Sequence, residues 1–410
     1  MTEQAKVPAI RFAGFTDPWE QRKLGDVASS FDYGLNAAAT EYDGQNKYLR
    51  ITDIDDETHE FSKSDLTTPL ADLAMSADYL LKEGDLLFAR TGASVGKTYL
   101  YRQFDGMVYF AGFLIRARIG EGADPEFAYQ ATLTDAYKKY VAITSQRSGQ
   151  PGVNAQEYAD YQLMLPSKTE QQQIGMTLRS LDDLITLHQR KYDKLVILKK
   201  SMLEKMFPKD GESVPEIRFA GFTDPWEQRK LVDIAEIVGG GTPDTNNSNY
   251  WDGDIDWYAP AELGNNIYAE SSTRKITQAG FDSCSTKMLP ADKTILFTSR
   301  AGIGNTAILR HSACTNQGFQ SLVIGDADVY FVYSMSERIK KWAEEKASGS
   351  TFLEISGRQL ETMPVNLPSL VEQQAIGSFF SHLDNLITLH QRKLELLQNI
   401  KKSLLDKMFV

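Results

Sequence analysis

Residues 10–24 read IRFAGFTDPWEQRKL, and residues 217–231 repeat the same fifteen letters without a change. A second pair follows at a similar offset, since LPSKTEQQQI…KMF at residues 165–207 returns as LPSLVEQQAI…KMF at residues 367–409. Repeats at a fixed offset indicate that a chain is built from duplicated structural units. The chain is therefore built from repeated frame segments around two inserts that do not visibly repeat.

The repeats divide the chain into six parts. The two inserts are 140 and 135 residues long, and each has the size of a single domain. The expected parts are a frame segment (1–24), a first insert (25–164), a first long helix (165–209), a linker with the second frame copy (210–231), a second insert (232–366) and a second long helix (367–410).

The two inserts share a faint skeleton. Tyr48–Ile54 aligns with Trp257–Leu263, and Leu86–Gly96 aligns with Ile295–Gly304. Each member of the latter pair reads as a buried strand, a glycine-rich turn that carries an arginine, and another strand. We therefore predict two copies of one mixed α/β domain whose surfaces have diverged.

The long repeats have the pattern of a coiled coil, with apolar residues at alternating steps of four and three over about five heptads. The seams comprise Ile174, Leu178, Leu181, Ile185, His188, Tyr192, Leu195, Met202 and Met206, and Ile376, Phe380, Leu383, Ile387, His390, Leu394, Leu397, Leu404 and Met408. A second apolar stripe predicts that each helix contacts more than one neighbour; it comprises Leu184, Leu187, Leu198, Leu386, Leu389 and Leu396. Each helix would be about 57 Å long.

The frame segments allow two local structures. Asp17-Pro18-Trp19-Glu20 has the residues of a helix N-cap, an N1 proline and a capping-box glutamate. The same residues suit a turn that leads into a short strand, and both readings stay open.

Composition is that of an ordinary globular protein, with 42% hydrophobic and 24% charged residues. No apolar run approaches the length of a membrane span, and the opening MTEQAKVP has no apolar core of a signal peptide. Cys284 and Cys314 lack metal-ligand spacing and read as reduced thiols. We expect a cytoplasmic protein.

Net charge is −11, which at first argues against nucleic acid as a partner. The acid is concentrated in the inserts: residues 25–164 carry 12 Lys+Arg against 21 Asp+Glu, and residues 232–366 carry 11 against 17. The helical stretches are slightly basic, with 7 against 5 in 170–207 and 5 against 4 in 372–410. DNA binding would need basic residues gathered on one face, or a basic partner.

Two glycine-rich stretches are candidates for recognition. Gly92–Thr98 resembles a phosphate-binding loop but is one residue short, and the matching turn at Arg300 has no lysine. An arginine on such a turn could reach a base edge or a phosphate, or could belong to a solvated turn. Gly239–Trp251 is a polar loop that suits either recognition or a simple connection, and Asn316, Gln317 and Gln320 carry amides that could pair with adenine.

The repeated histidines, His188 and His390, have no second ligand at the fourth position along the helix, which argues against a metal site. They fit a helix seam or a partner interface better. The chain has no Ser/His/Asp arrangement, HExxH motif, helicase box or methyltransferase box. We expect a protein without catalytic residues, metal or cofactor.

The pieces together resemble the specificity subunit of a type I restriction-modification system over essentially the whole chain. The resemblance rests on GGGTP…YW…DIDWYAPAEL, LLFARTGASVGK and ILFTSRAGIGN in the inserts, and on LPSKTEQQQI and LPSLVEQQAI before the helices. It implies an α+β fold with two mixed α/β target recognition domains, separated by two long antiparallel coiled-coil helices in a pseudo-two-fold internal repeat.

The resemblance also implies a function. Each recognition domain would read one half of a bipartite, asymmetric target in double-stranded DNA, and the helices would set the spacer at between one and two DNA turns. Two methyltransferase subunits would dock on the duplicated segments, and restriction subunits would join them.

The candidate residues follow from these patterns. Candidates for DNA binding are Arg90, Thr91, Ser94, Lys97, Gln150, Thr242, Asn246, Arg300, Asn305, Gln317 and Ser350. Candidates for partner docking are Phe12, Phe15, Trp19, Phe219, Phe222, Trp226, His188, Arg190, His390 and Arg392. Two alternatives remain: a coiled-coil scaffold whose two domains bind proteins, and an NTPase built on the Gly92 loop.

Overall fold

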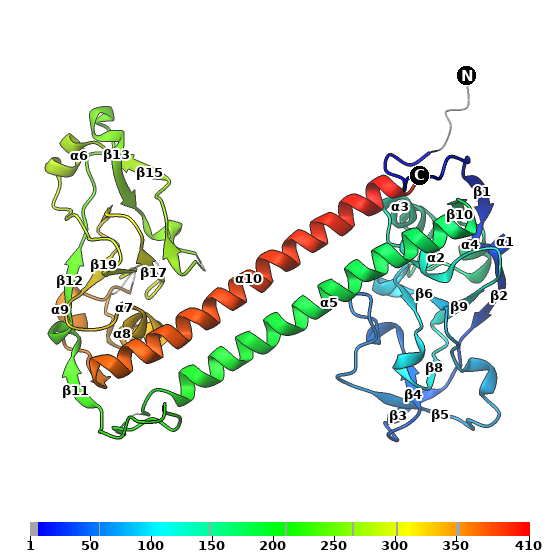
Figure 1. Ribbon diagram of the computed structural model, residues 1–410, viewed down its shortest axis with the longest axis horizontal. Helices are drawn as coiled ribbons and strands as arrows, with labels where there is room; N and C mark the ends of the chain where they lie inside the picture. The colour runs from blue at the N-terminus through cyan, green and yellow to red at the C-terminus, as the bar shows by residue number, and fades with distance from the viewer. Residues whose placement is uncertain are drawn as a thin grey trace. The chain divides into compact units, whose positions relative to one another are not determined.

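The computed structural model describes residues 7–56, 58–146, 149–209, 211–264, 266–300, 302–349 and 353–410 (Figure 1). These residues form two compact units: unit 1 comprises residues up to 190 together with 390–410, and unit 2 comprises residues 191–389. Each unit contains one mixed α/β domain, the first half of one long helix and the last half of the other.

Domain 1 (β1 to β10) is built on a four-stranded antiparallel sheet with the order β2-β9-β6-β7. Strand β6 (DLLFA) is buried at every position, because its alternate side chains enter two separate clusters, Leu86 and Phe88 on one face and Leu87 and Ala89 on the other. The pairs β1-β10, β3-β5 and β4-β8 complete the domain. The strands are β1 (Glu20–Lys23), β2 (Ala28–Tyr33), β3 (Ala38–Glu41), β4 (Lys47–Leu49), β5 (Thr67–Leu70), β6 (Asp85–Ala89), β7 (Thr98–Leu100), β8 (Val108–Phe110), β9 (Leu114–Ile119) and β10 (Gln162–Leu165), and the helices are α1 (Leu24–Val27), α2 (Pro125–Ala131), α3 (Asp135–Thr144) and α4 (Ala155–Ala159).

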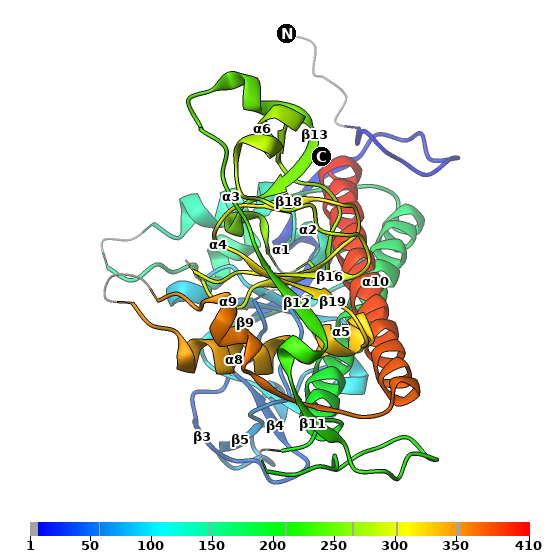
Figure 2. The ribbon, with the colours of Figure 1, turned by 90° about the vertical axis from the view of Figure 1, so that its left-hand side faces the viewer.

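Domain 2 (β11 to β20) has the same central sheet with one added strand, in the order β12-β19-β16-β17-β14. A three-stranded sheet, β15-β13-β18, and the pair β11-β20 complete the domain. In Figure 2 this domain faces the viewer. The strands are β11 (Glu227–Lys230), β12 (Ala235–Gly239), β13 (Trp251–Tyr258), β14 (Tyr268–Ala269), β15 (Arg274–Ile276), β16 (Thr294–Phe297), β17 (Thr306–Leu309), β18 (Cys314–Thr315), β19 (Gln320–Ile324) and β20 (Pro364–Leu367), and the helices are α6 (Gln278–Ser283), α7 (Val329–Ser334), α8 (Ser336–Lys346) and α9 (Gly357–Glu361).

The matching sheet order confirms that the inserts are two copies of one fold. Strands β6 and β16 precede the two arginine-bearing turns, and β7 and β17 follow them, as the sequence alignment predicted. The frame segments form strands: β1 pairs with β10 and β11 pairs with β20 in the same register, so the helical alternative for residues 17–20 is wrong.

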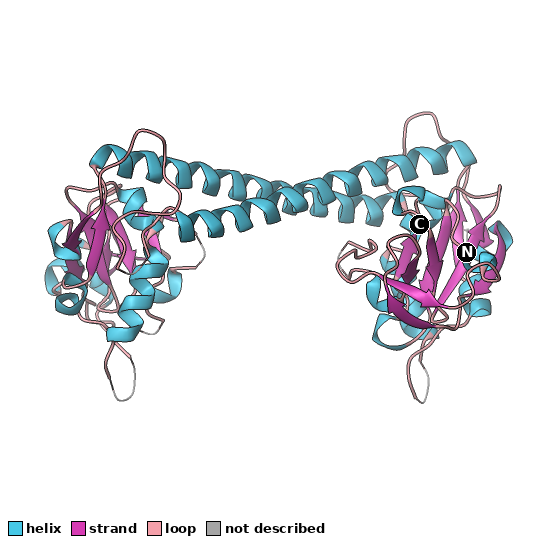
Figure 3. Ribbon diagram, turned by 90° about the horizontal axis from the view of Figure 1, so that it is seen from below, coloured by secondary structure: helices cyan, strands magenta, loops and turns pink. Residues whose placement is uncertain are grey.

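Two long helices, α5 (Lys168–Lys205) and α10 (Leu370–Met408), are prominent in Figure 3. They run antiparallel within each unit. In unit 1, Lys401 of α10 pairs with Asp182 of α5; in unit 2, Lys199 of α5 lies 2.5 Å from Asp384 of α10. Within the described residues, neither these helices nor any other combines the length and apolarity that crossing a membrane requires.

Each domain is fixed to the helices by the frame segment. In unit 1 the Arg11 guanidinium makes two hydrogen bonds, of 2.6 and 2.8 Å, to the Glu170 carboxylate in the first turn of α5. The backbone N–H of Ile10 donates to the Lys407 carbonyl, at 2.9 Å, near the end of α10. Unit 2 repeats both contacts. The Arg218 guanidinium donates to the Glu372 carboxylate at 2.6 and 2.7 Å, and the Ile217 N–H donates to the Lys205 carbonyl at 2.9 Å.

A glycine in each long helix allows the domain to approach closely. A Cβ on Gly175 would meet the Phe127 nitrogen of α2 at 3.0 Å, and a Cβ on Gly377 would meet the Phe331 nitrogen of α7 at the same distance. The neighbouring Gln171 bridges this junction, because its amide accepts from the Asp124 N–H at 2.9 Å and donates to the Pro166 carbonyl at 2.9 Å. Gln373 does the same in unit 2.

Candidate nucleic-acid interface

Arg90 stands directly after the buried strand β6. Its backbone is held on both sides, because its N–H donates to the Phe113 carbonyl at 3.1 Å and its carbonyl accepts from Val153 at 2.9 Å. The guanidinium lies 5.1 Å from the centre of the Tyr33 ring, and its Nε is buried without a hydrogen-bond partner. Among the described residues no carboxylate pairs with Arg90, so its charge is positioned but not neutralised.

The turn after Arg90 meets a second loop. Thr91 forms a β-bridge with Gly152, and the Gly92 N–H donates to the Pro151 carbonyl at 3.0 Å. A Cβ on Gly92 would come within 2.9 Å of the Gln150 amide nitrogen, so Gln150 lies against this turn. The 3₁₀ turn Gly92–Ser94 includes Ser94. The structure thus brings Arg90, Thr91, Ser94 and Gln150 together on one loop cluster, which we call the Arg90 cluster.

Lys97 has a different environment. Its ammonium pairs with Asp56, and its side chain lines a cavity in unit 1. A phosphate-binding loop leads into a helix, whereas this turn leads into strand β7, and Thr98 is buried and bonded to the Thr132 hydroxyl at 2.7 Å. The local structure therefore does not support the NTPase reading of Gly92–Thr98.

Domain 2 presents the corresponding turn, which we call the Arg300 cluster. The Thr298 hydroxyl closes the turn by donating to the Gly302 carbonyl at 2.5 Å and accepting from the Asn305 N–H at 2.9 Å. Arg300 is half-buried and forms a β-bridge with Glu354, while Asn305 is exposed. Ser350 lies outside the described residues, but flanking Ser348 and Glu354 exchange two backbone hydrogen bonds of 3.1 Å. In both domains the arginine turn is thus bridged to the loop before the last short helix.

A second polar cluster in domain 2 joins two loops. The Thr242 hydroxyl donates to the Gln317 amide oxygen, and the Trp257 indole donates to the Gly241 carbonyl at 2.9 Å. A Cβ on Gly240 would lie 2.2 Å from the Thr315 carbonyl oxygen, so only glycine permits this approach. Asn246 is exposed and bonds to Asp244. The side-chain oxygen of Asn316 accepts from Gly318 at 2.7 Å, and Gln320 is half-buried.

The frame aromatics have partners inside the chain. Trp19 is 5% exposed and packs edge-on against Phe127 at 5.9 Å and Phe409 at 6.5 Å. Trp226 is 4% exposed and packs against Phe207 and Phe331 at 5.9 and 5.7 Å. These two tryptophans are core residues and present almost no surface to a partner, which corrects their assignment to docking.

The other four frame aromatics are half-buried. Phe12 packs against the core of domain 1, and Phe219 packs edge-on against Phe379 at 5.9 Å. Docking by Phe15 and Phe222, which have part of their surface exposed, stays a prediction. Sequence reasoning missed the contacts of Arg11, Glu170, Gln171 and Gly175, although all four recur in the second copy, and that recurrence was the available signal.

On the helices, His188 and His390 face each other, with their Nδ1 atoms 2.7 Å apart. One ring must donate and the other accept in this contact, so the pair belongs to the helix seam. Arg190 and Arg392 are exposed, as a docking role requires. Among the described residues, no three His, Cys, Asp or Glu side chains gather as a metal site would require.

Six of the exposed apolar side chains of the long helices form two matching sets. In unit 1 the exposed fractions of Leu184, Leu187 and Ile400 are 43%, 45% and 39%. In unit 2 those of Leu386, Leu389 and Leu198 are 44%, 45% and 39%. We call them leucine set 1 and leucine set 2. Leu396 of the predicted stripe is 58% exposed and has no counterpart in these sets, in which Ile400 matches Leu198. Contact of the helices with a further neighbour stays a prediction.

Comparison with known proteins decides the family. Residues 16–196 and 223–399 match the model of the type I restriction modification DNA specificity domain. The chain belongs to this family. It is a specificity subunit with two recognition domains, one in each unit, and the scaffold alternative is not favoured.

Individual members agree. The MjaIX specificity subunit of Methanocaldococcus jannaschii is 36% identical over 191 residues, which are 45% of this chain and 44% of that protein. The putative MjaX specificity subunit of the same organism is 24% identical over 95% of this chain and 92% of its own length. The crystal structure of an S subunit from M. genitalium matches with a TM-score of 0.66 and 16% identity, over 98% of this chain and 99% of that one, and so shares the fold.

Proposed function

We propose that the two recognition domains each read one half of a bipartite, asymmetric sequence in double-stranded DNA. The Arg90 cluster would contact one half and the Arg300 cluster the other. The long helices would set the spacer, and two methyltransferase subunits would dock on leucine sets 1 and 2, with restriction subunits joining that complex. The chain itself would carry no catalytic residue and need no cofactor, and it would work in the cytoplasm.

The observation that carries this proposal is a repeated scaffold with unrepeated loops. Both domains place an arginine after the same buried strand and bridge it to the same following loop. The residues at the two bridges differ, since Thr91 is bridged to Gly152 in domain 1 and Arg300 to Glu354 in domain 2. Equal scaffolds with unequal contact residues suit a target whose two halves differ in sequence.

Charge complementarity supports a shared DNA interface. Domains that are themselves acidic give few phosphate contacts, and such contacts dominate DNA affinity. Methyltransferase subunits would therefore supply much of the basic surface. We expect the purified chain alone to bind DNA weakly. Tight binding that resists added salt would contradict the proposal that the methyltransferase subunits supply most phosphate contacts.

Arginine substitutions test the roles of the Arg90 and Arg300 clusters in DNA recognition. In the assembled methyltransferase, Arg90→Ala is expected to relax recognition at one half of the methylated sequence, and Arg300→Ala at the other, by about 1–3 kcal/mol each if the contact is to a base. Genome-wide mapping of methylated adenines measures this directly. Arg310 is the matched control in domain 2, because it already stacks on Tyr268 at 3.9 Å and pairs with Asp292 at 2.9 Å. An unchanged methylated sequence in both variants would refute the assignment.

Domain exchange tests the division of the target. Replacing domain 2 with that of a relative is expected to change one half of the methylated sequence and leave the other. A change in both halves, or in neither, would contradict it.

A further inference from the structure

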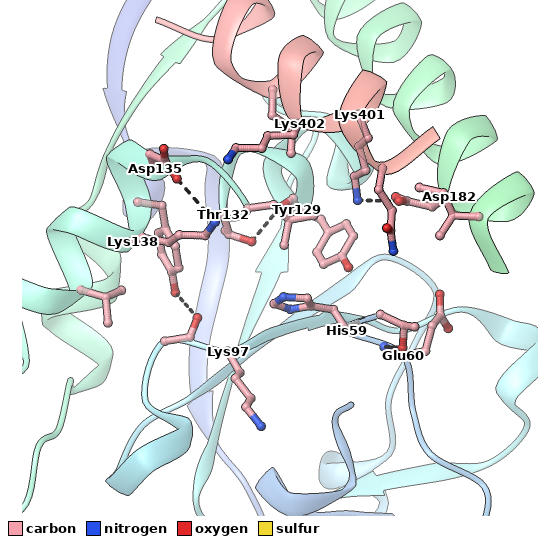
Figure 4. A pocket seen from close by; sticks show the side chains of 18 of the residues that line it. His59, Glu60, Lys97, Tyr129, Thr132, Asp135, Lys138, Asp182, Lys401 and Lys402 are labelled. Carbon is pink, nitrogen blue, oxygen red and sulfur yellow. Dashed lines mark hydrogen bonds and ion pairs between the residues drawn. The ribbon is translucent and has the colours of Figure 1, made fainter. Parts of the chain in front are cut away.

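Unit 1 contains a cavity of about 700 Å³ where domain 1 faces α5 and α10 (Figure 4). Its walls come from residues 58–60, the turn at 95–97, α2 and α3, and both long helices. The volume lies within the range of small-molecule sites, roughly 300–1,000 Å³. Apart from Lys97, none of its residues belongs to the candidate DNA contacts.

Tyr129 projects a free hydroxyl into this cavity. The residue is only 5% exposed, and among the described residues its hydroxyl has no hydrogen-bond partner. Burial, then the charges of Asp182 and Glu60, raise the pKa of Tyr129 well above its ordinary value. The hydroxyl therefore stays protonated and can donate to a ligand.

Glu60 and Asp182 place two carboxyl groups at this end of the cavity. Glu60 is half-buried and has no ion pair among the described residues, and burial raises the pKa of its carboxyl group. Asp182 accepts from the Gln130 amide at 2.8 Å and pairs with Lys401. In Figure 4 Glu60 and Asp182 lie on the same side of the cavity.

His59 adds a flat, uncharged surface. Its backbone has a φ of 55°, in the left-handed region that residues other than glycine seldom adopt. Its Nδ1 lies 3.2 Å from the Thr98 carbonyl, which can only accept, so Nδ1 carries the proton. Burial lowers the pKa of the ring, which keeps it neutral near pH 7. Figure 4 shows His59 next to Tyr129 inside the cavity.

The opposite end of the cavity in that view holds two lysines and one aspartate. Lys138 of α3 and Lys402 of α10 reach it from two elements. Lys138 is 3.5 Å from Asp135, an exposed neighbour on its own helix, and Lys402 has no ion pair among the described residues. Both ends thus hold an ion pair, Asp182 with Lys401 at one and Asp135 with Lys138 at the other. Among the described residues, the lining groups without an ion pair include Glu60 at the first end and Lys402 at the second.

This combination matches one ligand class. Carboxylates accept from the exocyclic amino group of a base, aromatic side chains stack on bases, and lysine binds phosphate as a point charge. We propose that the cavity binds a nucleoside phosphate whose base carries an exocyclic amino group, with the base near Glu60, His59 and Tyr129 and the phosphate near Lys138 and Lys402. Such a site lies beyond DNA recognition and does not depend on it.

Calorimetric titration of the full chain with AMP tests the proposal. IMP replaces the amino group with an oxo group, adenosine lacks the phosphate, and inorganic phosphate lacks the base. We expect AMP to bind about tenfold more tightly than IMP, which lacks the amino group that Glu60 would accept from. We also expect AMP to bind about tenfold more tightly than adenosine, which lacks the phosphate that the lysines would contact. CMP and UMP repeat the comparison with a smaller ring.

Variants assign the two ends. Glu60→Gln is expected to erase the preference for AMP over IMP. Tyr129→Phe is expected to lower the affinity for AMP. Lys402→Gln is expected to lower the affinity for AMP and leave the affinity for adenosine unchanged. Lys200→Gln and Tyr333→Phe are matched controls at the related positions of unit 2, and thermal unfolding reports whether each variant folds.

Four results would overturn the proposal: no binding of AMP at millimolar concentration, equal affinities for AMP and IMP, an unchanged preference in Glu60→Gln, or phosphate binding as tightly as AMP. If inorganic phosphate bound as tightly as AMP, the cavity would be a simple anion site.

Discussion

At the scale of single residues, the repeated ion pairs explain why the frame segments are identical. Glu170 and Glu372 are 0% and 1% exposed at the side chain, and each is held by two hydrogen bonds from one arginine. A buried carboxylate left without its cation is strongly destabilising, whereas an apolar pair of similar volume often costs nothing. The identity of the frame therefore reflects two equal internal contacts.

Arg11→Met is expected to lower the free energy of unfolding of unit 1 by about 3–5 kcal/mol, because Glu170 stays buried and unpaired. The double variant Arg11→Met/Glu170→Met should recover most of that loss. Denaturant unfolding followed by circular dichroism measures both. Arg22→Ala is the control, since Arg22 pairs with Glu20 at the surface and should cost less than about 1 kcal/mol. Equal losses in the single and double variants would show that the pair is not the cause.

Glu60 predicts a pH dependence of stability. Burial raises its pKa in the folded state, so the protonated form favours folding. This contribution is complete below the unfolded pKa, about 4.3, and is lost as pH rises through the folded value. Glu60→Gln should therefore raise the melting temperature at pH 7 and change it little at pH 4. A variant that is less stable at pH 7 would mean that attraction to Arg102 outweighs burial.

At the scale of elements, each long helix depends on its glycine. Alanine in place of glycine inside a helix usually stabilises by about 1 kcal/mol. Here the added methyl group of Gly377→Ala would meet the Asp328 carboxylate oxygen at 2.2 Å, and that of Gly175→Ala would meet Asp124 and Phe127 at 3.0 Å. We expect both changes to destabilise, by about 1–3 kcal/mol, with Gly377→Ala the worse.

Thermal unfolding of these variants is compared with Ser378→Ala, an exposed position next to Gly377 on the same helix. That control should be neutral or slightly stabilising. A gain in stability for Gly377→Ala would mean that α7 moves away from α10 without cost.

At the scale of the whole molecule, the two leucine sets predict stoichiometry. Leu187→Asp in set 1 is expected to remove one docked methyltransferase subunit and leave the other, and Leu389→Asp in set 2 should do the same on the opposite copy. The double variant should bind none. Native mass spectrometry counts the subunits. Met176→Asp is the control, because Met176 is 68% exposed on α5 but belongs to neither set. Loss of both subunits from either single variant would show that the two sites are coupled.

Much of the fold could be predicted from the sequence, and less of the site. The heptads predicted α5 and α10, and the alignment of Leu86–Gly96 with Ile295–Gly304 predicted the shared strand–turn–strand unit. Both are local, periodic patterns. The role of Trp19 was misjudged because a repeated residue is required equally by a repeated partner and by repeated internal packing, and only its burial against Phe127 separates the two.

What the sequence by itself determined is the two-copy plan: a duplicated frame, two long helices and two diverged copies of one domain. Repeats and heptads are patterns in the order of residues, so they can be recognised without the tertiary structure. Tertiary structure alone decided that Arg11 meets Glu170, that Gln150 lies against the Gly92 turn, and that Glu60, Tyr129 and Lys402 line one cavity. Such contacts join segments far apart in the chain, and close packing of whole elements sets them, which no local pattern encodes.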